Sequence, residues 1–372
     1  MKHLEIHILQ SVPVSCLNRD DLGSPKTAYF GGVKRARVSS QCWKRAIRKY
    51  ASELAPELFN GIRTKSLAQV LSGELSRMGI DCATESANEL VKAIITKDGD
   101  KDSKDKSSKD NDNKKEAIKS DVLLYISRKE IQTLAEEFVH AFQDKSTSKN
   151  AVKNAVTKLL KSKDAFSEDS ADIALFGRML AAKPIFNVEG AAMFGHALST
   201  HRVDTEPDYF TAIDDLRPAD RTAAEMVETL EFQSATYYRF AAINLDLLAD
   251  EHHLKRLDGD TRKEIVGKFV EAVLKAIPQA RQNSMNGNTL PGYVLAVYRD
   301  KGHPVQLVNA FERPVRCLDN EGLLQASIKA IRDEKANLQN LWGLDYSHSV
   351  ELSKDSQTTF DQFIEEVQSY VS

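Results

Sequence analysis

The chain opens on a segment in which apolar and polar side chains alternate. Leu4, Ile6 and Ile8 are separated by the polar residues His3, Glu5 and His7. A period of two residues is typical of a β-strand that buries only one of its faces. The sequence therefore predicts a half-buried strand at its start.

The hydrophobic period changes to that of a helix near residue 40. Ser39 and Ser40 are residue types that favour a helix N-cap. Apolar side chains then recur at helical spacing, at Trp43, Ala46, Ile47 and Tyr50. Cationic side chains occupy the other side, at Lys44, Arg45, Arg48 and Lys49. We predict an amphipathic helix with one basic face.

A helical region with an insertion is expected next. Residues 51–96 and 121–163 carry Leu, Val and Ile at helical spacing among Glu and Lys. Between them, residues 97–115 contain seven Lys, six Asp and no apolar side chain. Such a segment buries too little surface to offset the entropy of ordering it, so we predict a disordered surface insertion.

The pattern becomes strand-like again after residue 172. Residues 235–245 and 292–299 are rich in aromatic and β-branched side chains, which favour strands, and residues 261–277 have the period of an amphipathic helix. Strands that lie far apart in the sequence, with helices between them, indicate an α+β sheet domain that carries a helical insertion.

The charge is unevenly distributed along the chain. Residues 1–50 contain ten Lys and Arg against three Asp and Glu, a net charge of +7, whereas the whole chain carries −3, so the remainder carries −10. A local basic stretch on an acidic protein is typical of a defined track for phosphates. The alternative is a solvated helix face with no ligand.

Several classes of protein are not favoured. Residues 1–10 do not resemble a signal peptide, no apolar run is long enough to span a bilayer, and the four cysteines are far apart without a CxxC pair. We therefore predict a cytoplasmic protein without disulfides, metal or cofactor. Motifs for a phosphate loop, a serine hydrolase or a zinc protease are absent, and scattered histidines such as the pair His3 and His7 have no partner at ligand spacing.

Asp20 and Asp21 are the one candidate catalytic group. Adjacent carboxylates in a loop beside Arg19 are a pattern that can hold a divalent ion and activate water for phosphodiester cleavage. Asp is also a common turn residue, and adjacent side chains usually diverge. We keep a metal-dependent RNA-cleaving protein as an alternative.

The basic segment has the residue types that hold single-stranded nucleic acid. Cations for phosphates are Arg19, Lys26, Lys34, Arg35, Arg37, Lys44, Arg45 and Arg48. Ser39, Ser40 and Gln41 lie at the predicted helix start, where backbone N–H groups bind anions. Tyr29 and Phe30 precede two glycines that permit a close backbone approach.

Several blocks of the sequence resemble one known family. They are SCLNRDD, PKTAYFGGVKRARVSSQ and WKRAIRKY within residues 15–50, DIALFGRM at 172–179, HALSTHRVDTEPDYFTAIDDL at 196–216 and YYRFAAINLDLL at 237–248. These blocks are similar to the CasC family of the RAMP superfamily, the CRISPR RNA-binding backbone subunit of the type I-E Cascade complex. The resemblance extends over nearly the whole chain.

The resemblance implies a hand-shaped α+β protein. Its palm is an RRM-like (ferredoxin-like) sheet, with an inserted set of helical fingers and a thumb hairpin. The implied boundaries are palm at 1–50, 164–187 and 231–372, fingers at 51–163, and thumb at 188–230.

The resemblance also implies which residues contact RNA. Phosphate-binding positions are Arg19, Lys26, Ser39, Gln41, Lys44, Arg45 and Arg48. Base-contacting positions are Met179 in the palm and Tyr209, Phe210, Ile213 and Val227 in the thumb. Core packing is the alternative for Met179 and Phe210. Finger lysines at 145–161 resemble a DNA-holding helix, but their register does not match.

The function implied is that of a non-enzymatic scaffold. Copies stack head to tail along the CRISPR RNA, contact other Cascade subunits, and present the guide for pairing with target DNA. A recruited helicase-nuclease then degrades the target. The alternatives are the RNA-cleaving protein with a catalytic Asp20 or Asp21, and a general single-stranded RNA-binding protein.

Overall fold

The computed structural model describes residues 1–80, 83–96, 117–143, 170–212, 226–251, 253–316 and 321–371. The chain forms two compact units. We call the first the sheet unit, formed by Met1–Leu54, Ala192–Leu245 and Lys263–Ser372. The second is the helical unit, formed by Ala55–Ala191 and Asp246–Arg262.

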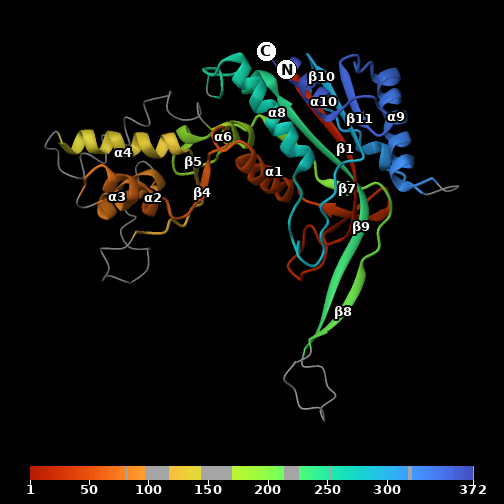
Figure 1. The fold of residues 1–372 in the computed structure, drawn as a ribbon, viewed down its shortest axis with the longest axis horizontal. Helices are drawn as coiled ribbons and strands as arrows, with labels where there is room; N and C mark the ends of the chain where they lie inside the picture. The colour runs from red at the N-terminus through yellow and green to blue at the C-terminus, as the bar shows by residue number, and fades with distance from the viewer. Residues whose placement is uncertain are drawn as a thin grey trace, which may run out of the picture. The chain divides into compact units, whose positions relative to one another are not determined.

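An antiparallel sheet organises the sheet unit (Figure 1). Within the described residues its strand order is β11-β10-β1-β9-β7-β3-β2, and β6 and β8 also pair with β9. The strands are β1 (His3–Ser15), β2 (Thr27–Phe30), β3 (Val33–Val38), β6 (Ala192–Phe194), β7 (Ala197–Ser199), β8 (Glu206–Ala212), β9 (Met226–Asn244), β10 (Tyr293–Arg299) and β11 (Ser349–Ser353). The accompanying helices are α1 (Ser40–Leu54), α8 (Gly259–Lys275), η2 (Val308–Phe311), α9 (Leu323–Trp342) and α10 (Phe360–Ser369).

Strand β1 is buried on both faces, so the prediction of a half-buried strand is wrong. On one face, Ile8 packs with Trp43 of α1 and Val273 of α8. On the other face, Leu9 belongs to a core cluster with Ile328 and Ile331 of α9. Because β1 pairs with both β9 and β10, it lies in the middle of the sheet, where helices cover each side.

The polar residues of β1 are accommodated in a buried hydrogen-bonded cluster. His3 Nε2 lies 3.2 Å and His7 Nε2 3.4 Å from the two carboxylate oxygens of Glu5. Arg299 pairs with the same carboxylate, and the Val305 N–H donates to it at 2.7 Å. Burial raises the pKa of Glu5, but the His3, His7 and Arg299 contacts outweigh it and lower that pKa to about 2. The alternation along β1 therefore reflects two different buried faces.

The helical unit has its own apolar core. Helices α2 (Leu67–Arg77), α3 (Ala83–Ile95) and α4 (Arg128–Gln143) pack around buried Leu, Ile and Ala side chains. The unit also contains α6 (Ala171–Phe176), α7 (Leu245–Leu248, at the junction with the sheet unit), η1 (Pro184–Phe186) and a two-stranded ribbon of β4 (Ile62–Thr64) and β5 (Leu124–Ile126).

The helices predicted within 51–96 and 121–143 are confirmed in outline, but the ribbon was not predicted. Helix α4 begins only after Ser127, because Ser127 and Glu130 cap its start: the Glu130 N–H donates to Ser127 Oγ at 3.1 Å, and the Ser127 N–H donates to Glu130 Oε2 at 2.7 Å. Residues 124–126 therefore remain extended and form β5.

The α+β class and the RRM-like antiparallel sheet are confirmed. The predicted insertion at 97–115 and the lysines at 145–161 lie outside the described residues, and the implied palm, fingers and thumb boundaries stay a prediction. None of the described helices combines the length and apolar character that a bilayer crossing requires.

Candidate nucleic-acid interface

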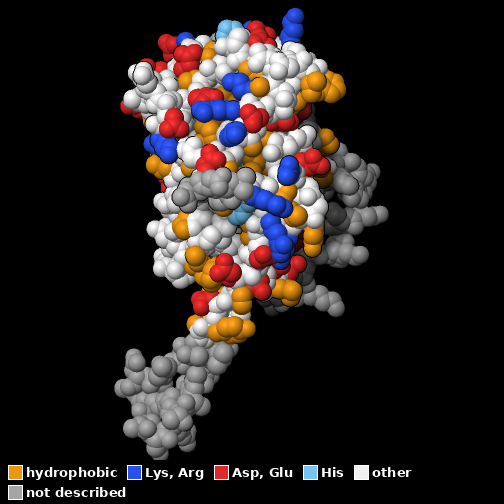
Figure 2. Space-filling model, turned by 90° about the vertical axis from the view of Figure 1, so that its right-hand side faces the viewer, with side chains coloured by type: hydrophobic (Ala, Val, Ile, Leu, Met, Phe, Trp, Pro, Cys, Tyr) orange, Lys and Arg blue, Asp and Glu red, His pale blue; other side chains and the backbone are white. Residues whose placement is uncertain are grey.

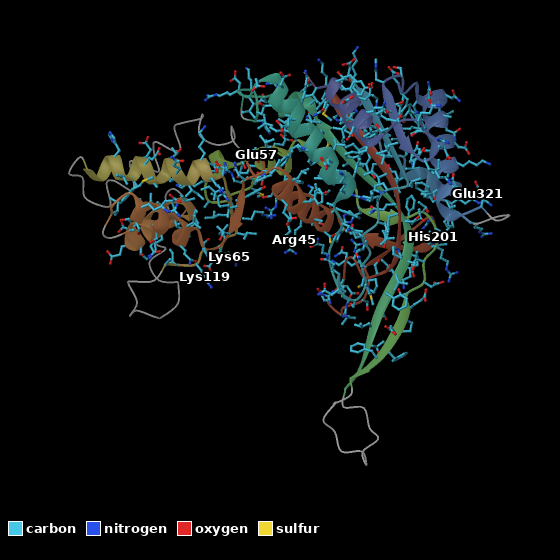
Figure 3. The ribbon with its side chains drawn as sticks, in the orientation of Figure 1. Arg45, Glu57, Lys65, Lys119, His201 and Glu321 are labelled. Carbon is cyan, nitrogen blue, oxygen red and sulfur yellow. The ribbon has the colours of Figure 1, made fainter. Side chains whose placement is uncertain are left out.

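Helix α1 separates an apolar face from a basic one, as its sequence predicts. Trp43, Ile47 and Ala51 are buried, with Trp43 and Ile47 packed beside the sheet. Arg45 is exposed, and Figure 3 shows it on α1. The side chains of Lys44 and Arg48 are partly exposed. The amphipathic pattern therefore leaves cations at the surface of a helix whose other side is anchored.

Lys44 is held in a defined position. Its ammonium lies 5.3 Å from the centre of the Phe194 ring, a cation–π contact. Burial lowers the pKa of Lys44 from its usual value. A cation that has already lost part of its hydration interacts more strongly with a phosphate than a fully hydrated one.

Asn18 joins the loop before β2 to the start of α1. Its backbone carbonyl accepts the Lys26 N–H at 2.8 Å, and its Oδ1 accepts the Ser39 N–H at 2.9 Å. Ser39 in turn caps the helix, because its Oγ accepts the Cys42 N–H at 3.3 Å. Sequence reasoning missed Asn18, although Asn is a frequent residue in such capping turns.

The predicted phosphate-binding residues of this unit gather around the start of α1. Burial raises the pKa of the Cys42 thiol, while the charges of Arg45 and Lys26 act to lower it. The backbone of Lys26 is tied to the helix cap through Asn18. Arg19 is exposed and forms a β-bridge with Pro25 in the same loop. The exposed Gln41 lies in the first turn of α1. This arrangement joins cations to a helix N-terminus, the geometry that suits phosphate.

Arg35 does not belong to this surface, so the interpretation of its charge as available for phosphate is wrong. Its side chain is fully buried. The guanidinium donates to the backbone carbonyls of Phe30, Ser199, Phe311 and Glu312, at distances from 2.6 to 3.2 Å. Arg35 therefore links its own strand β3 to β2, to β7 and to the end of η2.

The two glycines after Phe30 likewise serve the chain's own packing. Gly31 has a φ of +59°, and a Cβ at this position would lie 1.6 Å from the Glu312 carbonyl oxygen. The close approach expected from this turn is therefore an approach to Glu312. Gly32 also has a positive φ, but nothing lies within 4 Å of where its Cβ would be.

Asp20 acts in a turn. Its Oδ1 accepts the N–H groups of Leu22 at 2.9 Å and Ser24 at 3.0 Å. This is the hydrogen-bonding pattern of an Asx turn. One carboxylate oxygen of Asp20, a candidate catalytic residue together with Asp21, is therefore used to hold the turn. In the part of the chain that the structure describes, no three His, Cys, Asp or Glu side chains are grouped to bind a metal ion.

The predicted thumb contains a long hairpin. Strand β9 pairs with β1 along its second half, and its first half pairs with β8 to form an arm that projects from the sheet (Figure 1). Tyr209 is 71% and Phe210 39% exposed, so neither ring belongs to the core. Their partners in the ladder are Thr229 and Glu228. Figure 2 shows hydrophobic side chains at the surface of this arm.

The two aromatic rings lie on opposite faces of the hairpin, because successive strand residues alternate. Val227 pairs with Thr211, so it shares the Tyr209 face, although its side chain is not among those described. Ile213 lies outside the described residues.

Changing Tyr209 and Phe210 to Ala is expected to leave the melting temperature of the isolated chain nearly unchanged, because both rings are exposed. If they wedge against bases, the same change costs about 1–3 kcal/mol of RNA binding per lost stacking contact. Differential scanning calorimetry measures the melting temperature, and the yield of RNA-bearing complex measures the loss of RNA binding. A drop of 10 °C or more, which exceeds the effect expected of about 2 kcal/mol, with normal assembly would refute the assignment.

The root of the hairpin is fixed by the block HALSTHRV. The Thr200 backbone carbonyl accepts the Val315 N–H at 3.0 Å, and the Thr200 Oγ1 accepts the Ser327 hydroxyl at 2.9 Å. His201 lies beside it (Figure 3): its Nδ1–H donates to the Arg202 carbonyl at 2.8 Å, and its Nε2 accepts the Thr236 N–H of β9 at 3.2 Å. This block of the sequence thus ties the arm to β9, α9 and the segment after η2.

Acid is expected to weaken this root. Burial lowers the pKa of His201, and the charge of Arg35 adds to the effect. The unfolded chain then binds a proton at His201 more readily than the folded one, so stability falls as pH drops below about 6.5. Melting temperatures at pH 7.5 and 5.5 should differ less in His201→Gln than in the wild type. The exposed His303→Gln serves as the control, and an equal fall in all three proteins would contradict the expectation.

Met179 belongs to the helical unit, where it is 82% exposed and therefore not a core residue. The residues before it are structural. Asp172 accepts the hydroxyls of Tyr125 and Ser170, both at 2.6 Å, and the Gly61 N–H at 3.2 Å. The block DIALFGRM thus presents Met179 from a buried hydrogen-bonded support.

Arg178 completes that support. Its Nη1 lies 2.8 and 2.9 Å from the two carboxylate oxygens of the buried Glu130, and its Nε donates to the Phe186 carbonyl at 2.7 Å. Gly177 has a φ of +76°, and its position leaves no room for a Cβ beside the Gly190 backbone. These contacts fix the backbone immediately before Met179.

Comparison with known proteins gives a consistent result. A family model described as CT1975-like protein matches residues 4–369. A solved chain from a "CRISPR RNA-guided surveillance complex, pre-nicking" is 27% identical, with a TM-score of 0.79 and 100% of both chains covered. A chain from a "CRISPR RNA-guided surveillance complex" is 24% identical, with a TM-score of 0.68 and 99% of each chain covered, and shows likeness of fold. A search of curated proteins finds no match.

Proposed function

Because the chain belongs to the CT1975-like protein family, we propose that it is a backbone subunit of a CRISPR RNA-guided surveillance complex and that it binds the guide RNA. The observation that carries the proposal is the surface at the start of α1. There Lys44 and Arg45 lie in the first turns of α1, and the backbone of Lys26 is tied to the helix cap through Asn18. Cations at a helix N-terminus match the chemistry of a phosphodiester backbone.

The hairpin supplies the second part of the proposal. An arm with exposed aromatic side chains on both faces can contact bases, while the α1 surface contacts phosphates. Neither element reads sequence, because base pairing of the guide does so. We propose Met179 as a further base contact.

The finer assignment follows the resemblance to the CasC family. We propose a type I-E complex in the cytoplasm, in which copies of the chain stack head to tail along the guide, beside other Cascade subunits. Such a heterologous interface extends as a filament. The guide then pairs with target DNA, and a recruited helicase-nuclease degrades it. The chain itself acts as a scaffold without catalysis.

Sequencing the RNA that co-purifies with the tagged chain tests this function. Cells should express the chain together with a CRISPR array and its neighbouring genes. The proposal predicts enrichment of spacers with repeat-derived flanks relative to total RNA. RNA recovered in proportion to cellular abundance would instead indicate a general single-strand binder. Cleavage of matched RNA with Mg²⁺ that is lost in Asp20→Asn or Asp21→Asn would indicate the RNA-cleaving alternative.

A further inference from the structure

The two faces of the β4–β5 ribbon of the helical unit have different surroundings. Ile62, Leu124 and Ile126 pack against the core cluster of that unit. In the ladder, Arg63 pairs with Tyr125, and both alternate with those core residues. The other face of the ribbon therefore carries Arg63, which is exposed, and Tyr125, which is buried.

Arg63 is held in place on this face. The Tyr125 hydroxyl donates to Asp172 at 2.6 Å, which fixes the ring. The Arg63 guanidinium lies over that ring, 5.5 Å from its centre, while the side chain as a whole stays exposed. A stacked guanidinium loses little further entropy when it binds an anion.

Two lysines extend the basic face. Lys65 follows β4, and the Ser120 N–H donates to its carbonyl at 2.8 Å, so Lys65 and Lys119 are neighbours (Figure 3). Both are exposed. Among the described residues, neither these lysines nor Arg63 forms an ion pair. Three cations thus lie together, and none of them has an ion-pair partner among the described residues.

Apolar side chains are exposed beside these cations. Leu123, directly before β5, is 47% exposed, and Val122 is 41% exposed. Leu123 and Met179 line the same apolar recess of the helical unit. Cations next to exposed apolar side chains are the combination that single-stranded nucleic acid requires, because it presents phosphates and unstacked bases together.

We propose that Arg63, Lys65 and Lys119 bind successive phosphates of a single-stranded polynucleotide and that Leu123 and Met179 contact its bases. The proposal rests on the function proposed above and adds a second phosphate site, in the helical unit. Residues two apart on a strand are about 7 Å apart, similar to successive phosphates in an extended polynucleotide. The polynucleotide is either the guide RNA or a single strand of target DNA, which share this backbone chemistry.

Binding of labelled oligouridylate and oligothymidylate to the full chain, at several salt concentrations, tests the proposal. Each phosphate contact to a single strand contributes about 0.7 to the slope of log Kd against log salt. The R63Q/K65Q/K119Q variant should therefore lower the slope by about 2. The matched control K92Q/K329Q/K354Q removes three exposed lysines elsewhere and should leave the slope unchanged. Circular dichroism verifies that each variant is folded.

The two probes identify the source of the strand. If the variant lowers the slope with oligouridylate, the site binds RNA. If it lowers the slope with oligothymidylate, the site binds single-stranded DNA. If R63Q/K65Q/K119Q keeps the wild-type slope with both probes while Lys44→Glu/Arg48→Glu loses RNA binding, this second site is overturned and the proposed function stands. If the wild-type chain binds neither probe, both proposals fail.

Discussion

Replacing Arg178 with Met is expected to lower the free energy of unfolding of the helical unit by about 3–5 kcal/mol, because it leaves the Glu130 carboxylate buried without its counter-charge. Both partners are almost completely inaccessible to solvent, so water cannot replace the lost contact. Far-UV circular dichroism during urea unfolding measures the effect. Tryptophan fluorescence follows the sheet unit separately, because both tryptophans of the chain, Trp43 and Trp342, lie there.

Two variants control this experiment. In Arg77→Met the lost pair with Glu74 is on an exposed helix face, and the expected cost is below about 1 kcal/mol. In Arg178→Met/Glu130→Gln the stranded charge is removed while the side-chain carbonyl can still accept the Ser127 N–H, so most of the loss should be recovered. Equal stability of the two single variants would show that the buried pair contributes nothing to the support of Met179.

Replacing Gly31 with Ala is expected to cost the sheet unit about 2–5 kcal/mol. A left-handed conformation costs a residue with a side chain about 1–2 kcal/mol, and overpacking against the Glu312 carbonyl adds about 1–3 kcal/mol. The substitution also displaces an acceptor of the buried Arg35 guanidinium. The urea midpoint of the Trp43 fluorescence transition measures the loss.

Gly32→Ala is the matched control for this substitution. Gly32 also has a positive φ, +77°, but a Cβ there would meet nothing. Only the conformational cost of about 1–2 kcal/mol applies. If both substitutions cost the same, the contact between Gly31 and Glu312 has no energetic weight, and the turn is free to approach a ligand.

Helix α1 could be predicted from the sequence because its signals are local, whereas the hairpin was implied only by the family resemblance. The serine cap and the apolar stripe of α1 lie within one short segment, and the structure confirms them at Ser39, Trp43 and Ile47. The α+β class was likewise predictable from separated strands, and β10 begins and ends within one residue of the predicted 292–299.

The remaining features depend on contacts between distant residues. Arg35 is in a run of cations that all look alike in sequence, and only the carbonyls of Ser199 and Phe311, more than 160 residues away, select it for burial. Glu130 pairs with Arg178 across 48 residues. The three-residue strands of the β4–β5 ribbon are too short to interrupt a helical pattern visibly. Exposure of Met179 and Phe210 was also open until the structure placed them outside the core.

The salt dependence of guide RNA binding distinguishes an RNA-binding surface on α1 from a solvated helix face. Lys44→Glu/Arg48→Glu should weaken binding of a repeat-flanked RNA and lower the slope of log Kd against log salt by about 1.4, which corresponds to two phosphate contacts to a single strand. The control Lys329→Glu/Lys354→Glu changes charge equally at exposed positions on α9 and after β11. We expect a wild-type slope for the control and a reduced slope for the α1 variant; equal slopes for both would contradict an RNA-binding surface on α1.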